Sequence, residues 1–251
     1  MTYLSVIIPS YNSSVVLKNN IPYLKSGLDK KGFTYEIIIV DDGSDDNTAA
    51  AAKELACKYL KNPTNMGKGA ALKKGMLHAE GKFRIFTDAD IPFEADAFGK
   101  FLYSLDKEDF ALAIGDRTLA ESSYHREIPG LRKIASSWFS FLVGRFVAGG
   151  MFDTQCGLKG FRADVAEDLF GVSRINGFTI DVEILSIALK RNYTIKRLPV
   201  TLRSQEGTSV KILKHSFTMI IDLFRIKINH VFKKYKKVQS NKLAENLFSG
   251  Y

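Results

Sequence analysis

The chain has 251 residues, of which 45% are hydrophobic and 25% are charged. This composition is typical of a soluble globular protein with one large hydrophobic core or two unequal ones, and it excludes a chain too polar to form a core. The net charge of +9 and the pI of about 9.4 indicate either an anionic partner or a solvated basic surface.

The cysteine content bears on the compartment. Only two cysteines, Cys57 and Cys156, are present, and no secretory apolar segment opens the chain. Both thiols are interpreted as ordinary small core residues. A reducing cytosolic location is therefore expected.

The first part of the chain alternates predicted strands and helices up to about residue 117. Nearly unbroken apolar runs, typical of parallel strands buried on both faces, cover residues 4–8, 36–40 and 83–87, with a further strand at 110–115. Helical patterns cover residues 14–27, 47–59, 68–79 and 94–105, and a turn-rich segment covers 62–69. The sequence therefore predicts an α/β fold with a Rossmann-like, mainly parallel sheet and helices on both faces.

Acidic residues follow two of these strands. Asp41 and Asp42 come directly after the second apolar run, and Asp88 and Asp90 follow the strand at 83–87. Because the ligand crevice of an open α/β sheet lies outside the carboxyl ends of its strands, both clusters are expected to face one site. Hard cations such as Mg²⁺ take one or two carboxylates and leave other positions to substrate phosphates. Asp88-x-Asp90 therefore predicts a divalent-metal site in an enzyme of diphosphates, although such pairs also occur in surface turns.

Two further segments bear on ligand binding. The first strand runs into Pro9-Ser10-Tyr11-Asn12, which can bring a ring and an amide to the same rim. Gly67-x-Gly69 lacks the third glycine and the long preceding strand of a dinucleotide fingerprint, and no Walker-A sequence is present. Phosphate binding of the P-loop kind is therefore excluded.

The basic excess lies late in the chain. Asp222 is the single acidic residue among Lys211, Lys214, Arg225, Lys227, Lys233, Lys234, Lys236 and Lys237. Apolar residues recur at helical spacing at Leu213, Phe217, Ile220, Phe224, Ile228, Val231 and Tyr235. This pattern predicts a basic amphipathic helix, which either binds an anionic membrane surface or packs on the core with its lysines in water.

Two other features of the second half limit the partners. An apolar stretch around Trp138, at residues 131–147, is shorter than the roughly 20 residues of a bilayer span and is interrupted by charges. No nucleic-acid-binding signature accompanies the basic tail, so no nucleic-acid partner is expected. The simplest organisation is one domain at 1–209, with a nucleotide half at about 1–117 and an acceptor half at about 118–209, followed by a basic membrane-surface helix and tail at 210–251.

Taken in order, these segments resemble those of a known family. Pro9-Ser10-Tyr11-Asn12, Asp41-Asp42-Gly43-Ser44, Asn65-x-Gly67-x-Gly69 and Asp88-Ala89-Asp90 resemble segments of family 2 glycosyltransferases, which have the GT-A fold. Residues 153–161 and 178–183 resemble dolichyl-phosphate glucosyltransferases and, more distantly, polyprenyl-phosphate mannosyltransferases. The likeness runs from about Leu4 to about Lys211. It implies an inverting, metal-dependent hexosyltransferase that moves a sugar from a sugar nucleotide to polyprenyl or dolichyl phosphate.

On the donor side, the resemblance implies that the sugar nucleotide contacts Pro9, Tyr11, Asp41, Asp42, Lys68, Asp88 and Ala89. Pro9 and Tyr11 would form a wall for the base. Asp41 and Asp42 would accept hydrogen bonds from the base and the ribose. Asp88 and Asp90 would address the ribose and hold Mg²⁺ or Mn²⁺ on the diphosphate, where the metal neutralises charge on the departing nucleoside diphosphate.

On the acceptor side, Arg117 and Arg132 match family positions that contact the acceptor phosphate, for which a guanidinium fork is well suited. A phosphate monoester has its second pKa near ~6, so it can attack the anomeric carbon without a histidine base. Asp181 is a candidate for orienting that acceptor or for general-base catalysis, and it is equally typical of a helix N-terminus. The four histidines have no metal-ligand spacing and are interpreted as surface or core residues.

Departures from the family pattern bear on the donor. Ser13 stands where many relatives have glutamate, which weakens one expected nucleotide contact. Pro92 stands where mannosyltransferases carry a metal-binding glutamine, and Glu206 precedes the late Gly-x-Ser, here Gly207-Thr208-Ser209, where they tend to carry arginine. UDP-glucose is therefore favoured over GDP-mannose.

Several alternatives remain. The transferase candidates are a GDP-mannose-dependent polyprenyl-phosphate mannosyltransferase and a family 2 enzyme acting on a soluble or cell-envelope glycan. A nucleotidyltransferase would require a glycine-rich signature after the first strand. A sugar-nucleotide-binding module without activity would be expected to lose its metal carboxylates. The expected location is the cytoplasmic face of a membrane, with the anionic surface and an integral membrane protein as candidate partners.

Overall fold

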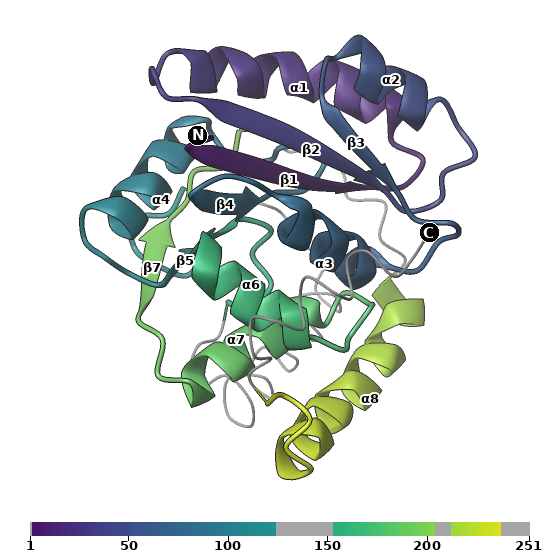
Figure 1. Ribbon diagram of the computed structural model, residues 1–251, viewed down its shortest axis with the longest axis vertical. Helices are drawn as coiled ribbons and strands as arrows, with labels where there is room; N and C mark the ends of the chain where they lie inside the picture. The colour runs from purple at the N-terminus through teal and green to yellow at the C-terminus, as the bar shows by residue number, and fades with distance from the viewer. Residues whose placement is uncertain (1, 124–152, 204–211, 237–251) are drawn as a thin grey trace.

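The computed structural model describes residues 2–123, 153–203 and 212–236 (Figure 1). Arg132, Trp138, Glu206 and Lys211 lie outside the described residues, as does the expected domain boundary near residue 209. The described strands are β1 (Leu4–Ser10), β2 (Tyr35–Asp41), β3 (Lys58–Lys61), β4 (Phe83–Phe86), β5 (Leu112–Asp116), β6 (Lys159–Arg162) and β7 (Ile195–Pro199). The described helices are α1 (Ser14–Asp29), α2 (Thr48–Glu54), α3 (Lys68–His78), α4 (Asp96–Asp106), α6 (Ala163–Val172), α7 (Ile180–Lys190) and α8 (Ile212–Val231).

The strands form one seven-stranded sheet in the order β3-β2-β1-β4-β6-β5-β7. All neighbouring pairs are parallel except those made by β6, which runs antiparallel to both β4 and β5. The prediction of an α/β fold with a mainly parallel sheet is therefore confirmed. The antiparallel insertion of β6 was not expected from the sequence.

Helices cover both faces of the sheet, as predicted (Figure 1). Successive side chains of β1 point to opposite faces, so Val6 and Ile8 join the core formed with α1, α2 and α4. Ile7 joins the core on the other face, formed with α3, α6 and α7. Cys156 lies in the first core and burial raises the pKa of its thiol to about 12, in agreement with its interpretation as a core residue.

One predicted helix was wrong in its second half. The alanine-rich pattern predicted a helix over residues 47–59, but α2 ends at Glu54 and Tyr59 lies in β3. Ala56 adopts a left-handed conformation with φ of 48°, which ends the helical path. β3 then pairs with β2, and this tertiary pairing outweighs the local helix propensity of the segment.

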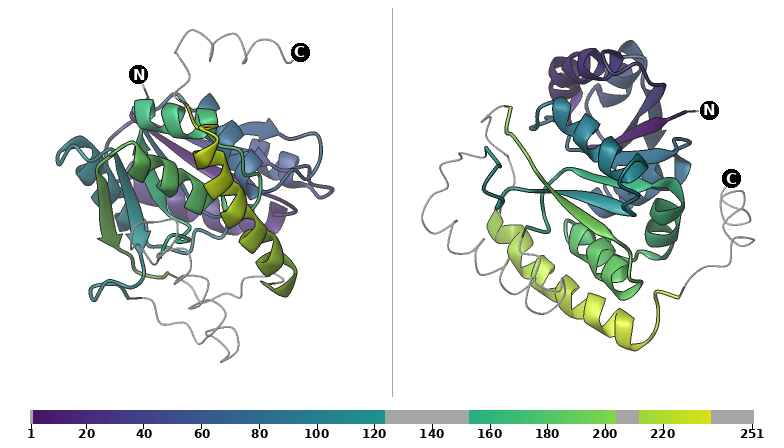
Figure 2. Two further views of the ribbon diagram at one scale, coloured as in Figure 1. Left: turned by 90° about the horizontal axis from the view of Figure 1, so that it is seen from below. Right: turned by 90° about the vertical axis from the view of Figure 1, so that its left-hand side faces the viewer.

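The predicted C-terminal helix is present as α8, which lies on the opposite side of the molecule from α1 and α2 (Figure 2). Among the described side chains of α8, those of Asp222, Ile226 and Asn229 are buried, and Tyr235 is buried just beyond the end of the helix. The predicted apolar face is instead exposed at Ile220, Phe224, Ile228 and Val231, with exposed fractions of 41–76%. Of the two alternatives predicted for this helix, packing of the apolar face on the core is therefore wrong for these four residues.

Membrane crossing is a separate question from surface exposure. Within the described residues, no helix combines the length and the apolar character that crossing a bilayer requires.

Candidate functional site

The predicted site residues follow strand ends at one edge of the sheet. β1 and β2 are in parallel register with Ser10 opposite Asp41, and β4 ends at Phe86, shortly before Asp88. Because β6 runs antiparallel, its first residue, Lys159, lies opposite Phe86 at this same edge. The topology therefore adds a basic residue, which the sequence reasoning missed, to the predicted acidic clusters.

Asp41 is buried and shapes the loop that follows β2. Its Oδ1 accepts hydrogen bonds from the backbone N–H (2.8 Å) and the hydroxyl (2.5 Å) of Ser44, and its Oδ2 accepts one from the Tyr59 hydroxyl (2.5 Å). The carboxylate is 1% exposed. These contacts give Asp41 a loop-positioning role, and direct contact with a nucleotide stays a prediction.

Asp42 organises the segment that leads into α3. Its Oδ1 accepts hydrogen bonds from Asn62 Nδ2 at 2.8 Å and from the Met66 N–H at 3.0 Å, and its Oδ2 accepts one from the Gly67 N–H at 2.7 Å. The side chain is thus used inside the protein to fold the turn-rich segment. Its predicted contact with the ribose or base also stays a prediction.

The end of β1 presents an aromatic ring at the rim. Tyr11 is 45% exposed, whereas the neighbouring Asn12 is held with a φ of 48°. The Asn12 N–H donates to Ser44 Oγ at 2.9 Å, and Asn12 Oδ1 accepts from the Asp45 N–H at 3.0 Å. The ring is thus carried on a tied-down turn, a suitable position for stacking against a flat ligand group.

Lys68 and Asp88 form an ion pair at the centre of the edge. Lys68 is the first residue of α3, and its Nζ lies 2.6 Å from Asp88 Oδ1. Burial by itself would lower the pKa of Lys68, but the carboxylates of Asp88, Asp181 and Asp90 raise it above its usual value. Lys68 therefore remains charged, and its ammonium group interacts electrostatically with all three of these predicted acidic residues.

Asp88 and Asp90 fit a metal that is shared with a substrate. The Asp88 side chain is 40% exposed, and both residues offer the oxygen ligands that hard cations require. An added Cβ at Gly157 would lie 2.1 Å from Asp88 Oδ2, so this glycine leaves the space that the carboxylate occupies. Within the described part of the chain, no group of three or more His, Cys, Asp and Glu residues is arranged to hold a metal. Two carboxylates plus a diphosphate are the ligand set that these residues suit.

The turn after Asp90 is held by an arginine that no motif marked. Arg203 donates to the backbone carbonyls of Asp90 (3.3 Å) and Ile91 (3.2 Å), and its guanidinium lies 4.2 Å from the ring centroid of Tyr23. Ile91 itself has a φ of 42°. Arg203 therefore stabilises the strained turn that follows Asp88 and Asp90, the carboxylates predicted to bind a metal.

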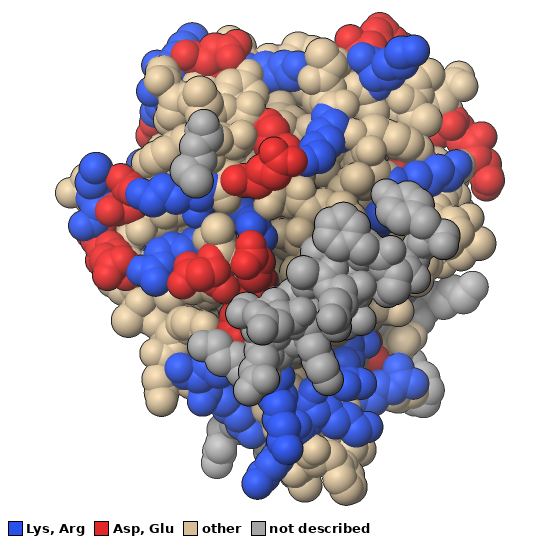
Figure 3. All heavy atoms as spheres, in the orientation of Figure 1, with Lys and Arg blue, Asp and Glu red and all other residues tan. Residues whose placement is uncertain are grey.

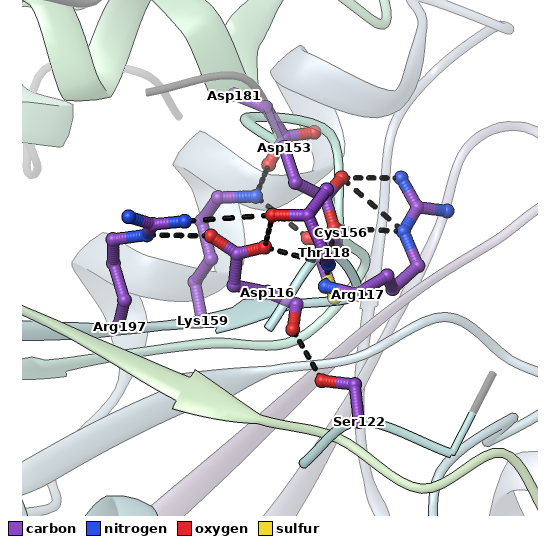
Figure 4. Close-up of polar contacts among 9 residues, drawn as sticks. All are labelled: Asp116, Arg117, Thr118, Ser122, Asp153, Cys156, Lys159, Asp181 and Arg197. Atoms are coloured by element: carbon purple, nitrogen blue, oxygen red, sulfur yellow. Dashed lines mark hydrogen bonds and ion pairs between the residues drawn. The ribbon is translucent and has the colours of Figure 1, made fainter. Parts of the chain in front are cut away.

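Arg117 is held by an aspartate from a distant segment (Figure 4). Its backbone N–H donates to Asp153 Oδ2 at 2.6 Å, Nε donates to the same oxygen at 2.9 Å, and Nη2 donates to Oδ1 at 2.5 Å. Asp153 is 7% exposed, so the fork is firmly oriented. The role of Arg117 toward an acceptor phosphate stays a prediction, and Asp153 is a positioning partner that sequence reasoning missed.

The turn that carries Arg117 is fixed from the other side by Asp116. Its Oδ1 accepts from the Thr118 N–H (2.8 Å) and hydroxyl (2.6 Å), and its Oδ2 accepts from Arg197 Nε (2.6 Å). Burial would raise the pKa of Asp116, but hydrogen bonds from Thr118 and the Arg197 guanidinium hold it below its usual range. The carboxylate therefore stays ionised and keeps the end of β5 rigid.

Asp181 is paired with Lys159 at the base of the site (Figure 4). The two side chains are 4% and 0% exposed, and Asp181 Oδ1 lies 2.5 Å from Lys159 Nζ, which also donates to the Cys156 carbonyl at 2.7 Å. Asp181 does lie in the first turn of α7, as the helix-terminus interpretation predicted. A lysine inside the apolar run Leu158–Phe161 was the available signal, because a buried cation requires a buried partner.

The chain is similar in sequence to several known glycosyltransferases. The profile described as Glycosyl transferase family 2 matches residues 5–170. Dolichyl-phosphate β-glucosyltransferase ALG5D of Trichomonas vaginalis is 36% identical, and the match covers 90% of this chain and 73% of that protein. The dolichyl-phosphate β-glucosyltransferase of Dictyostelium discoideum is 34% identical over 93% of this chain and 76% of that protein. The human dolichyl-phosphate β-glucosyltransferase is 29% identical, and the match covers 96% of this chain and 79% of the human protein.

Solved structures support the fold alone, because their sequence identity to this chain is low. Glucosyl-3-phosphoglycerate synthase from Mycobacterium tuberculosis, in complex with phosphoglyceric acid, has a TM-score of 0.70 and 18% identity over 90% of this chain and 80% of its own. The complex of that enzyme with Mn²⁺, UDP-glucose and phosphoglyceric acid has a TM-score of 0.68 and is 16% identical in sequence. This match covers 95% of the present chain and 82% of the synthase chain.

Replacing one member of the Lys159–Asp181 pair should be strongly destabilising. We expect Lys159→Met or Asp181→Leu alone to lower the free energy of unfolding by about 3–5 kcal/mol, because each leaves an uncompensated buried charge. The double variant should recover most of this loss, as measured by urea denaturation. Single variants as stable as the wild type would contradict the buried ion pair. Activity that stays lost in a stable double variant would indicate that the Lys159–Asp181 pair has a further role in the reaction.

Proposed function

The chain belongs to glycosyl transferase family 2, and we propose that it transfers glucose from UDP-glucose to dolichyl phosphate or a similar polyprenyl phosphate. The observation that carries this proposal is the pair of relatives at 34–36% identity, both dolichyl-phosphate β-glucosyltransferases, aligned over at least 90% of this chain. The site supports this proposal because carboxylates suited to a metal, at Asp88 and Asp90, lie on one side, and Arg117, oriented by Asp153, lies on the other. A sugar nucleotide and a phosphate acceptor can meet between them.

The donor would lie along the ends of β1, β2 and β4. The exposed ring of Tyr11 would stack on the base, beside the loops shaped by Asp41 and Asp42. Asp88 and Asp90 would hold Mg²⁺ or Mn²⁺, and Mn²⁺ accompanies UDP-glucose in the related synthase structure. When bound, the metal supplies positive charge to the departing diphosphate. Lys68 adds a fixed cation beside Asp88.

The acceptor phosphate would lie against Arg117, with Arg132 as a second candidate ligand. Asp153 keeps the Arg117 fork in one orientation, which favours a planar, bidentate contact with phosphate oxygens. One phosphate oxygen would attack the anomeric carbon as the bond from that carbon to the diphosphate oxygen breaks. The electron pair leaves with UDP, and the configuration is inverted. With a second pKa near ~6, the dianionic phosphate needs no proton removed before it attacks. Asp181 would serve to orient the acceptor.

A lipid acceptor requires the site to reach a membrane surface, and we propose that α8 provides this contact. Ile220, Phe224, Ile228 and Val231 form an exposed apolar series along the helix. Exposed basic residues accompany them at Arg225, Lys227, Lys233, Lys234 and Lys236. Blue side chains gather at the lower end of the molecule in Figure 3, the end at which α8 lies in Figure 1. Apolar contact and positive charge together suit the interface of an anionic bilayer.

The donor and acceptor can be tested with a panel of sugar nucleotides and a short polyprenyl phosphate, with glycosyl lipid and free nucleoside diphosphate both measured. UDP-glucose should give the highest kcat/KM, and excess chelator should stop the transfer. Better turnover of GDP-mannose would overturn the donor assignment. Transfer to soluble glycans in place of the lipid phosphate would overturn the acceptor. Undiminished turnover in chelator would overturn the metal assignment.

Arg117→Ala should impair acceptor use by at least about tenfold, because a charge-assisted hydrogen bond to phosphate contributes roughly 1.5–3 kcal/mol. The KM for UDP-glucose should change much less. This variant also leaves the buried Asp153 without its guanidinium partner, so Arg117→Ala/Asp153→Ala is the matched control for lost stability. If the double variant regains normal acceptor use, Arg117 acts only by neutralising Asp153.

Liposome sedimentation tests the membrane contact. The full chain should sediment with vesicles that contain phosphatidylserine at low salt and be largely released at high salt, since the Debye length falls from roughly 10 Å at 0.1 M to about 3 Å at 1 M. Phe224→Ser/Val231→Ser should reduce binding, because these side chains are 63% and 76% exposed on α8. Tyr103→Ser, which removes a 61% exposed ring from α4, is the control. Equal binding of all three proteins would exclude α8 as the contact.

A further inference from the structure

Glu183 on α7 is a fully buried carboxylate that the proposed reaction does not use. Both of its oxygens accept from the Arg174 N–H at 3.0 Å, and Oε2 also accepts from the Ile175 N–H at 2.9 Å. Its Oε1 accepts a further hydrogen bond from the Tyr235 hydroxyl at 2.6 Å. One side chain thus joins the loop before α7 to the residues after α8.

The loop that Glu183 holds is pressed against the start of α3. The Asn176 carbonyl accepts hydrogen bonds from the Gly69 N–H at 2.7 Å and the Ala70 N–H at 3.3 Å. An added Cβ at Gly67 would lie 2.4 Å from this carbonyl oxygen, and one at Gly69 would lie 2.3 Å from the Ile175 carbonyl oxygen. The backbone of the loop therefore packs directly against the backbone at the start of α3, with no room for side chains between them. This contact fixes the first turn of α3. Lys68, the partner of Asp88, lies between these two glycines.

Tyr235 fastens the end of α8 to α7. Its hydroxyl accepts from Asn229 Nδ2 at 3.2 Å while donating to Glu183, and its carbonyl accepts from Arg191 Nη2 at 2.9 Å. The ring lies 4.7 Å from that of His230. The position of α8 on the protein is therefore defined at the same carboxylate that holds the loop.

We propose that Glu183 is a positioning residue that links the seat of α8 to the donor side of the site. Tyr235 orients the carboxylate, the carboxylate holds the loop at 174–176, and the loop holds the turn of α3 that carries Lys68. Three consecutive contacts thus separate the end of α8 from the Lys68–Asp88 pair. The identity of the ligand at that pair, a nucleoside diphosphate with its metal, rests on the proposed function.

The test uses the full chain with Tyr235→Phe, which removes the hydroxyl and keeps the ring, and with Glu183→Gln. Tyr35→Phe is the matched control, because it removes a phenol–carboxylate hydrogen bond of 2.6 Å to Asp29 on the α1 side of the sheet. Amide hydrogen exchange at Gly69, Ala70, Arg174 and Ile175 should accelerate about fivefold in Tyr235→Phe and more in Glu183→Gln. The control should leave these amides unchanged. One lost hydrogen bond of about 1 kcal/mol corresponds to this factor.

A second measurement connects the link to ligand binding. The Kd for UDP with Mn²⁺ should rise about five- to tenfold in Tyr235→Phe and stay unchanged in the control variant. Unchanged exchange in Tyr235→Phe would overturn the link, and so would acceleration spread evenly over the sheet, which is the result of general destabilisation. Local acceleration with unaltered UDP affinity would overturn the positioning role. The exchange arm needs no ligand, so wild-type protein that fails to bind UDP would refute the proposed function separately.

Discussion

Negative charge collected at one edge of the sheet is the constraint on which the rest of the structure depends. The strand ends and α7 bring together the carboxylates of Asp41, Asp42, Asp88, Asp116 and Asp181. Four of these five residues are nearly fully buried, and ionised groups taken out of water require partners. Backbone N–H groups, hydroxyls, Lys68, Lys159 and Arg197 supply them. The surrounding loops are ordered because they carry these donors.

The division of labour among the acidic residues follows from exposure. Asp41 and Asp42 are buried and bound to their own loops, whereas Asp88 is 40% exposed and can accept an external cation. Two clusters that look alike in sequence thus do different physical work. The first builds the rim, and we propose that the second presents charge to a ligand.

The sequence was sufficient for features that are local. The strands at β1, β2, β4 and β5 appear as apolar runs, and the acidic clusters are found beside the strand ends that precede them. The partners of these clusters were beyond such reasoning, because Arg117 and Asp153 are separated by 36 residues and Arg203 and Asp90 by 113. The direction of β6 was equally hidden, since an apolar run has no orientation. Lys159 was also missed, although the sequence carried a signal for it, because a lysine beside apolar residues in a strand predicts burial with a charged partner.

The ion pair between Arg117 and Asp153 also joins two residues that are 36 positions apart in the chain. These residues flank the segment between β5 and the approach to β6, and their ion pair brings its two ends together beside the sheet. The entropic cost of bringing the two ends of a chain segment together rises slowly with its length, by about 0.6 kcal/mol for each doubling. Because the Arg117–Asp153 pair fixes both ends of this segment beside the sheet, a change in the length of the segment would cost little closure entropy and would leave the two ends in place.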